Sequence, residues 1–333
     1  MEQLSITPPY ERYIKRHFSR IGLALITLIF APSVVVGIIS GIISVFSPSL
    51  LQTHSWLTVA LSTLPMYLVG MPLAYLILRP MPKTAVVRRR VPVSQIFILF
   101  CLCCFAATVA EMVGAYLTSI LNLLLSIPET DLLGTILGDL SPLPLFLLTV
   151  VLAPIFEELF FRKFLIDRIV RYGELPAILI SGFLFGLFHG NLQQAPYAIL
   201  LGFVFAFAYV KSGKLWYSIL LHAMLNFFSG FLTLLLVPET IDMSLPALAD
   251  VGRLLYLLAM LGFFIVGLVF LCTRFRKARQ SLQEASVPNF GKLAFRNVGM
   301  ILYLVLMAFS IVSALFLPVL MRLLEQLMSQ LHL

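Results

Sequence analysis

Long apolar runs, separated by short polar segments, fill nearly the whole chain. A helix rises 1.5 Å per residue, so about 20 apolar residues cross the hydrocarbon core of a bilayer. The pattern therefore predicts an all-α, polytopic transmembrane helical bundle with about nine spans. The nine apolar runs lie at residues 21–46, 55–78, 93–113, 143–161, 175–189, 194–210, 215–237, 254–272 and 297–320.

The third apolar run continues past residue 113 to residue 126 and is too long for one perpendicular span. We therefore expect a break near Gly114, followed by an amphipathic helix over residues 115–126 at the outer surface. Glu111 would then lie near the outer end of the span, and we interpret it as an interfacial acid.

The composition excludes a soluble domain. Of the 333 residues, 60% are hydrophobic and 11% are charged, a balance that is typical of polytopic membrane proteins. The polar start, residues 1–20, lacks the features of a cleaved signal peptide, so we expect the first span to be retained. We predict three parts: N-terminal scaffold helices (1–142, three spans), a catalytic core (143–237, four spans) and C-terminal helices (238–333, two spans).

The Lys and Arg residues gather in the segments that would lie on one side of the membrane. With the N-terminus inside, every Lys and Arg except Arg253 and Arg322 falls in a segment on the inner side. The positive-inside rule then predicts an N-in/C-out protein of the plasma (cytoplasmic) membrane. The net charge of +8 favours contact with anionic membrane lipid. The pattern lacks the basic soluble domain that a nucleic acid would need, so we expect no nucleic-acid partner.

A few polar side chains interrupt the apolar runs between residues 143 and 237. Ionisable groups within a bilayer cost several kcal/mol and usually mark a functional site. The chain is organised around the first three of them, which lie close together in one run. The set comprises Glu157, Glu158, Arg162, His189, His222 and Asn226.

Helical spacing predicts different surroundings for the two glutamates. Glu158 and Arg162 are four residues apart and face each other on a helix. Glu157 lies about 100° round the helix and is left without that partner. Pro154 should kink the helix and free a carbonyl nearby. We expect the polar continuation, residues 163–171, to be an amphipathic helix at the inner surface.

The two histidines lie on later spans. His189 shares a helix face with Phe185, close to a stripe of glycines at every fourth position (Gly182, Gly186 and Gly190) that allows close helix packing. His222 and Asn226 also lie four residues apart, where they form either part of a site or a hydrogen-bonding pair between helices. The rise per residue predicts a deeper position for His189 than for Glu157 and His222.

These residue types suit the hydrolysis of an amide bond. A carboxylate paired with an imidazole can hold and deprotonate a water molecule. A second imidazole and a carboxamide can donate hydrogen bonds to a developing oxyanion. The cysteines (Cys101, Cys103, Cys104 and Cys272) lie in apolar runs, and we interpret them as small buried hydrophobic residues.

Three motifs, in order and on separate spans, resemble the CPBP family of intramembrane endopeptidases, also known as the CAAX prenyl protease 2, lysostaphin resistance protein A-like or Abi family. They are Glu157-Glu158-x-x-x-Arg162, Phe185-x-x-x-His189 and His222-x-x-x-Asn226. Lys163 stands where the family often has glycine. The resemblance covers residues 143–237.

The resemblance implies a membrane-embedded protease that cleaves membrane-associated or lipidated peptides and proteins. It implies that Glu157 and His189 activate water, that His222 and Asn226 stabilise the oxyanion, and that Glu158, Arg162 and Phe185 support them. We expect no cofactor. Alternatively, Glu157, His189 and His222 supply three ligands to zinc.

Two rival functions remain open from the sequence. A transporter or channel would line a polar path with these residues, although the outer halves of the spans are almost wholly apolar. A catalytically idle member would act as a membrane scaffold or bacteriocin-immunity protein.

Overall fold

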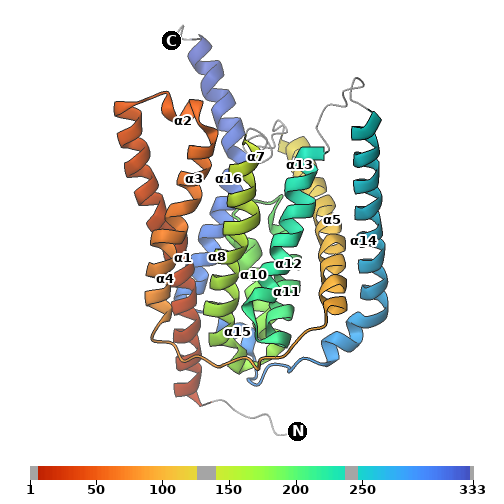
Figure 1. The fold of residues 1–333 in the computed structure, drawn as a ribbon. Coiled ribbons are helices and arrows are strands. Elements are labelled where there is room, and N and C mark those ends of the chain that lie inside the picture. The colour runs from red at the N-terminus through yellow and green to blue at the C-terminus, as the bar shows by residue number, and fades with distance from the viewer. Residues whose placement is uncertain (1–6, 126–139, 237–246, 331–333) are drawn as a thin grey trace.

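The computed structural model describes residues 7–125, 140–236 and 247–330, and every regular element within these ranges is a helix. Eight helices in the described part are long and apolar enough to cross a membrane. A ninth apolar helix, α10 (Glu174–Phe188), has 15 residues. The prediction of an all-α transmembrane bundle is confirmed (Figure 1).

The N-terminal helices form a hairpin. α1 (Pro8–Phe46) begins well before the apolar run, because Ile14, His17 and Phe18 in its polar start are buried. It packs against the returning limb of the hairpin and against α16 (Val298–Gln330). The returning elements are α2 (Leu50–Thr53), α3 (Ser55–Pro65), the π-helical segment η1 (Met66–Gly70) and α4 (Met71–Leu78).

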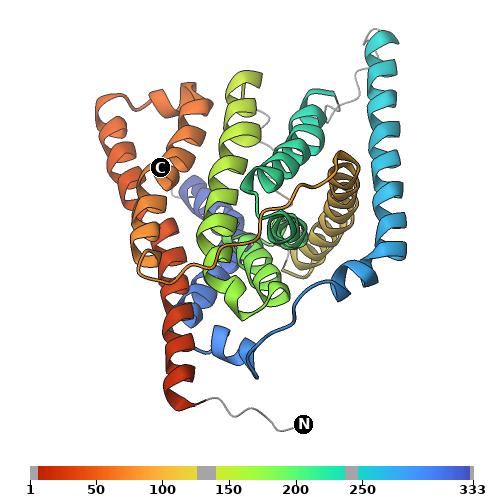
Figure 2. The same ribbon diagram turned by 60° about the horizontal axis from the view of Figure 1, so that its bottom comes forward.

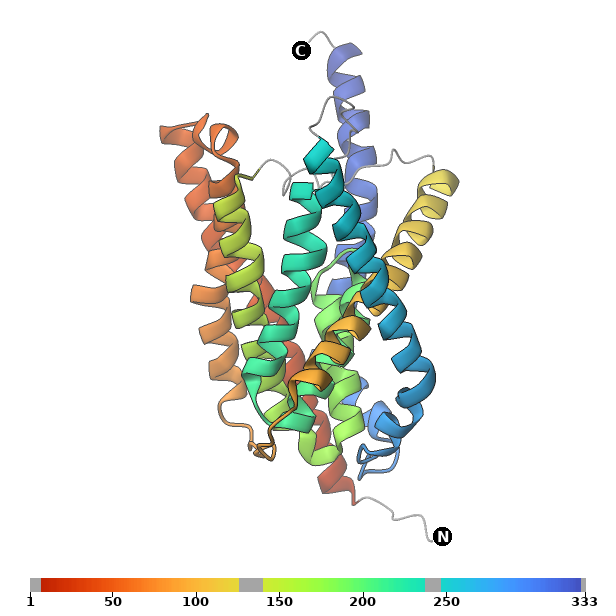
Figure 3. The ribbon, with the colours of Figure 1, turned by 45° about the vertical axis from the view of Figure 1, so that its right-hand side comes forward.

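The expected break near Gly114 is wrong. α5 (Val93–Leu125) continues through this position as one helix. A Cβ atom at Gly114 would lie 2.6 Å from the carbonyl oxygen of Gln193, so the glycine allows a close backbone contact instead of ending the helix. α14 (Ala247–Gln280) packs along α5 at the edge of the bundle (Figure 3).

The helix that carries the glutamates runs without interruption from residue 142 to residue 172. Its segments are α7 (Pro142–Leu145), η2 (Phe146–Leu152), α8 (Ala153–Glu158), η3 (Leu159–Ile166), α9 (Asp167–Ile169) and η4 (Val170–Tyr172). η2 and η3 are π-helical, whereas η4 is a 3₁₀ turn.

The prediction of a surface helix over residues 163–171 is wrong in one respect. The helix does continue, but it enters the core, where Asp167 and Arg168 are buried. Arg168 donates hydrogen bonds to the carbonyls of Leu78 (2.8 Å) and Phe164 (2.6 Å). Nη2 of Arg168 is buried without a hydrogen-bond partner among the described residues. The polar pattern that resembled an amphipathic surface therefore reflects side chains that are buried within the bundle and hydrogen-bonded there only in part.

α10 and α11 (Ala195–Ser212) cross at the glycine stripe. A Cβ atom at Gly182 or Gly186 would clash with the backbone of Phe203 or Ile199. Gly190 lies beyond the helix, in a left-handed conformation (φ +66°). α11 lies in the middle of the bundle (Figure 2), in contact with α5, α10 and α12 (Leu215–Leu225).

The last elements complete the bundle and set the positions of its ends. η5 (Asn226–Phe231, π-helical) and α13 (Leu232–Leu236) extend α12, and α15 (Phe290–Phe295) precedes α16. The start of α1, the basic connection over residues 79–92 and α15 lie at one end of the molecule, and the end of α16 lies at the other (Figure 1). This arrangement fits an odd number of crossings. The predicted boundary at residue 237 lies outside the described residues.

Candidate active site

The two glutamates sit on α8, a single short α-helical segment between two π-helical ones. Pro154 lies in the first turn of α8, directly after η2, where its missing N–H and fixed φ disturb the regular ladder. π-helical segments often occur at functional sites. Two of these segments carry predicted site residues, since Arg162 lies in η3 and Asn226 begins η5.

Glu158 and Arg162 form the expected ion pair, and both side chains are fully buried. Nε of Arg162 donates to Oε2 of Glu158 over 2.8 Å, and a second guanidinium nitrogen lies 3.3 Å from Oε1. A third donates to the hydroxyl of Ser181 on α10 (2.6 Å), which in turn donates to the carbonyl of Phe161 (2.9 Å). The pair thus ties α8 and η3 to α10.

His222 on α12 lies between the two carboxylates. Its Nδ1 is 3.1 Å from Oε1 of Glu158, and its Nε2 is 4.0 Å from Oε2 of Glu157. A carboxylate only accepts hydrogen bonds, so Nδ1 of His222 is the donor to Glu158. The imidazole stacks on Phe205 (ring centroids 4.9 Å apart) and meets the ring of Phe185 edge-on (5.8 Å). These contacts fix the ring so that Nε2 faces Glu157.

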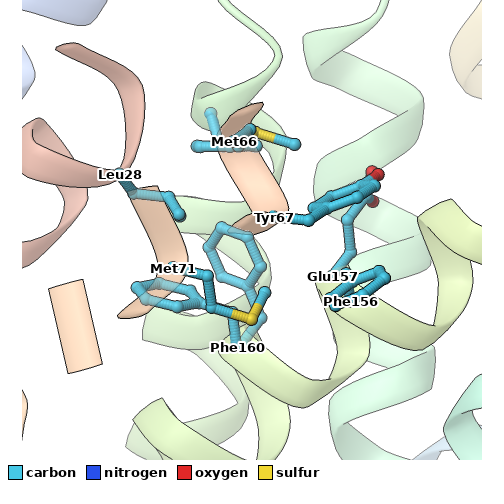
Figure 4. A pocket seen from close by; sticks show the side chains of 9 residues that line it. Leu28, Met66, Tyr67, Met71, Phe156, Glu157 and Phe160 are labelled. Atoms are coloured by element: carbon cyan, nitrogen blue, oxygen red, sulfur yellow. The ribbon is translucent and has the colours of Figure 1, made fainter. Parts of the chain in front are cut away.

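Glu157 is the more accessible of the two acids. Its side chain is 15% exposed, against 0% for Glu158. It lies at the edge of a small apolar pocket that also receives side chains from α1, η1 and α4, as Figure 4 shows. Glu157 therefore has a carboxylate that a substrate or a water molecule can reach.

His189 follows the last residue of α10. Its Nδ1 lies 2.9 Å from the carbonyl oxygen of Phe185, which can only accept, so Nδ1 carries the proton and a neutral ring has Nε2 free as a base. The ring of Phe185 contacts both imidazoles, His189 at 5.1 Å and His222 at 5.8 Å between centroids. α10 runs from Glu174 to Phe188, close to the expected span over residues 175–189, and the deeper position of His189 relative to Glu157 and His222 stays a prediction.

Asn226 lies one turn after His222 and joins α12 to η2. Its Nδ2 donates to the carbonyl of Thr149 over 2.8 Å. This carbonyl belongs to the π-helical segment before Pro154, in agreement with the expectation that the proline frees a carbonyl nearby. A carboxamide nitrogen has two N–H donors, so the contact with Thr149 holds the group and leaves a second donor for a ligand.

The residues do not form a zinc site as they stand. In the described part of the chain, no three His, Cys, Asp or Glu side chains come together as a metal-binding group. Glu157 and His222 approach each other. Nδ1 of His189 donates to the carbonyl of Phe185 and leaves Nε2 free for a ligand, an orientation that metal-binding histidines also adopt. Glu157, His189 and His222 are not grouped in this structure, and their ligation of zinc stays an alternative prediction.

Sequence reasoning missed four residues that build the site. Ser181 and Thr149 act through short-range hydrogen bonds, and Phe205 through stacking, none of which leaves a pattern along the chain. The fourth is Tyr67 of η1, whose ring stacks on Phe156 at 4.3 Å. In Figure 4 the side chain of Tyr67 extends toward Glu157. A tyrosine in an otherwise apolar run is the only signal that could have indicated it.

The site thus defines a membrane-embedded helical protein with a carboxylate–imidazole centre suited to hydrolysis. Residues 139–228 match the family described as Type II CAAX prenyl endopeptidase Rce1-like. A protein of Bacillus subtilis (strain 168), named "Putative membrane peptidase YdiL", is 31% identical over 102 residues, which are 30% of this chain and 42% of the relative. No solved structure matches the chain.

Both comparisons cover only part of the chain, and they support the resemblance of residues 139–228, which hold the three motifs, to this family of CAAX prenyl endopeptidases. The family match spans 90 residues, 139–228, and the chain covers about two fifths of the length of the Bacillus relative.

Proposed function

We propose that the protein is an endopeptidase that hydrolyses peptide bonds of membrane-associated or lipidated peptides and proteins, with a water molecule activated by Glu157 and His189. The observation that carries this proposal is the arrangement of His222. One nitrogen of its ring is held by the buried Glu158–Arg162 pair and the other faces the accessible carboxylate of Glu157.

Glu157, Glu158, Arg162 and His222 form a cluster whose net charge depends on the protonation of His222. Two carboxylates flank the imidazole of His222, and one guanidinium neutralises only one of them. Protonation of His222 makes the cluster of Glu157, Glu158, Arg162 and His222 neutral, which lowers the cost of placing charge in an apolar environment. In this state Nε2 of His222 carries a proton that it can donate to an oxyanion.

The reaction then follows general base catalysis. A water molecule held by Glu157 and Nε2 of His189 attacks the peptide carbonyl while its proton passes to Glu157. The oxygen of the carbonyl becomes an oxyanion, which His222 and the second N–H of Asn226 stabilise. Glu157 returns the proton to the leaving nitrogen as the C–N bond breaks, so that no proton is gained or lost by the protein.

The position of the site supports a proposal for the substrate class. Glu157 is reached from an apolar pocket, and several spanning helices surround the site. A substrate must therefore be apolar itself or be held at the membrane by a lipid. We propose peptides or lipidated proteins that enter from the membrane, with membrane lipid as the surrounding partner and no nucleic acid.

The test is hydrolysis by the purified protein in lipid, with a library of quenched lipidated peptides and ¹⁸O-labelled water. We expect cleavage with ¹⁸O in the new carboxyl group, loss of cleavage in Glu157→Ala and His189→Ala, and no loss in Glu111→Gln, which changes another acid in an apolar run. A wild-type protein that cleaves nothing while Glu157→Ala keeps the biological effect would instead show an idle scaffold.

A further inference from the structure

An apolar pocket lies directly beside Glu157. Figure 4 shows side chains from three separate parts of the chain that point into it. Apart from the carboxylate of Glu157 and the hydroxyl of Tyr67, its lining is hydrocarbon or thioether. The lining residues are Leu28, Met66, Tyr67, Met71, Phe156, Glu157, Phe160, Phe161 and Phe188.

Two walls of the pocket come from different sources. One wall consists of aromatic side chains of α8, η3 and α10, within the family match over residues 139–228. The other consists of Leu28 on α1, Met66 and Tyr67 on η1, and Met71 on α4. The N-terminal hairpin therefore does more than support the bundle, since it closes a space that the catalytic helices leave open.

We propose that this pocket binds an apolar side chain of the substrate next to the peptide bond to be cut, and that Leu28, Met66 and Met71 determine which side chain fits. The inference rests on the proposed function. Glu157 belongs to the lining, so a side chain in the pocket would place its own backbone carbonyl close to the carboxylate. Binding energy from such a remote group helps to orient the bond that reacts.

The walls of the pocket favour one side chain over a long lipid chain. The non-atom space of about 190 Å³ at the pocket includes space open to the surroundings, so an occupant must displace flexible lining side chains. Methionine is unbranched and has three rotatable bonds, so Met66 and Met71 can adjust to an occupant. The opposite wall is more rigid, because Phe161 packs edge-on against both Phe185 (5.2 Å) and Phe188 (5.4 Å).

Tyr67 sets the boundary between the pocket and the site. Its ring stacks on Phe156, the residue is 4% exposed, and its side chain extends toward Glu157 (Figure 4). An occupant would therefore contact the face of an aromatic ring at the point where the pocket meets the carboxylate. This position is suited to holding the substrate and not to accepting the proton, which falls to Glu157.

The experiment measures the selectivity of each variant between peptides with large and small side chains, in addition to its activity. Wild type, Leu28→Ala, Met66→Ala and Met71→Ala are assayed on peptides that differ at one position beside the cleaved bond, from alanine to tryptophan. We expect the ratio of kcat/KM between large and small side chains to rise about tenfold or more in the pocket variants, since a single methylene in an apolar pocket changes such ratios by about 10–200-fold. Leu99→Ala on α5, a buried leucine outside this pocket, should leave the ratio unchanged.

Three outcomes can be told apart: a variant that does not fold, an incorrect proposed function and an incorrect assignment of the pocket. Met66 is only partly buried, so Met66→Ala tests the pocket even where Leu28→Ala does not fold. Unchanged ratios at all positions in folded, active variants would overturn the pocket. If the wild type cleaves nothing, the proposed function fails.

In that event, peptides retained by Glu157→Gln and by Glu157→Gln/Met66→Ala are compared by mass spectrometry. A shift toward larger side chains in the double variant supports the pocket, and identical or empty sets overturn it.

Discussion

The buried ion pair is the structural centre of the site. Oε2 of Glu158 accepts from Arg162, and Oε1 accepts from both Arg162 and His222, so that one side chain orients both a cation and the proposed oxyanion donor. Residues that orient the groups in contact with substrate are often as important to activity as those groups themselves.

We predict that Glu158→Gln destabilises the protein by about 3–5 kcal/mol, because the change leaves the guanidinium of Arg162 buried without its counter-charge. Unfolding in detergent with a chemical denaturant measures this effect. The matched control is Glu174→Gln, whose partner Lys211 is 2.8 Å away in a partly exposed pair that should contribute about 1 kcal/mol or less. An equal decrease in the free energy of unfolding in the two variants would show that the buried ion pair stabilises the protein no more than the partly exposed pair.

A second prediction at this scale concerns metal. We propose that the chemistry needs no metal ion, so a strong zinc chelator should leave the rate of cleavage within about twofold of the untreated rate. Activity that disappears on chelation and returns with added zinc would instead make Glu157, His189 and His222 ligands. Wild-type protein incubated with zinc alone provides the control for inhibition by excess metal.

The sequence predicted contacts only between residues that lie close together along the chain. Glu158 and Arg162 lie four residues apart on one helix, and helical geometry alone is enough to infer their contact. The approach of His222 to both glutamates joins residues 64 positions apart, and no periodicity encodes it. Tyr67 was missed for the same reason, because its role depends on how the N-terminal hairpin packs against α8.

At the scale of elements, glycines decide how closely helices approach. Gly182 and Gly186 on α10 bring its backbone against α11, and this contact places Ser181, Phe185 and His189 relative to the glutamates. The stripe was visible in the sequence. Gly114 looked like a break because it ends an apolar run of ordinary span length, yet it serves the same close packing within a continuous α5.

We predict that Gly186→Leu lowers the stability by about 1–3 kcal/mol or more, because a side chain there must displace Ile199 and the backbone of Ala195. Gly262→Leu on α14 is the matched control, since a Cβ atom at Gly262 meets no neighbour within 4 Å. Thermal unfolding in detergent compares the two variants. A midpoint that falls as far in the control as in Gly186→Leu would contradict the packing argument.

At the scale of the whole molecule, the fold class followed from hydrophobicity alone. Runs of apolar residues long enough to cross a bilayer leave the backbone no alternative to helix. The start of α1 could not be predicted in the same way, because its polar residues are buried against other helices and not exposed. Burial by neighbours is a property of the assembled bundle.

The orientation N-in/C-out is a prediction that the bundle makes testable. Ala85, in the basic connection, and Ser49, in the turn between α1 and α2, are both exposed and lie at opposite ends of the N-terminal hairpin (Figure 1). In a protein whose four native cysteines are replaced, we expect Ala85→Cys to react with an impermeant maleimide only in inside-out vesicles. Ser49→Cys should react only in right-side-out vesicles, and the reverse pattern would overturn the orientation.

The most direct test of the central claim is the turnover rate of Glu157→Gln, an isosteric change that removes only the base. It is compared with wild type and with Glu111→Gln in the same lipid, at equal amounts of folded protein. General base catalysis typically contributes about 10²–10⁴-fold to the rate. We therefore predict that kcat of Glu157→Gln falls by at least about 10²-fold while its unfolding temperature stays at the wild-type value. The kcat of Glu111→Gln should equal that of the wild type. Cleavage by Glu157→Gln at the wild-type rate would contradict the assignment of Glu157 as the base.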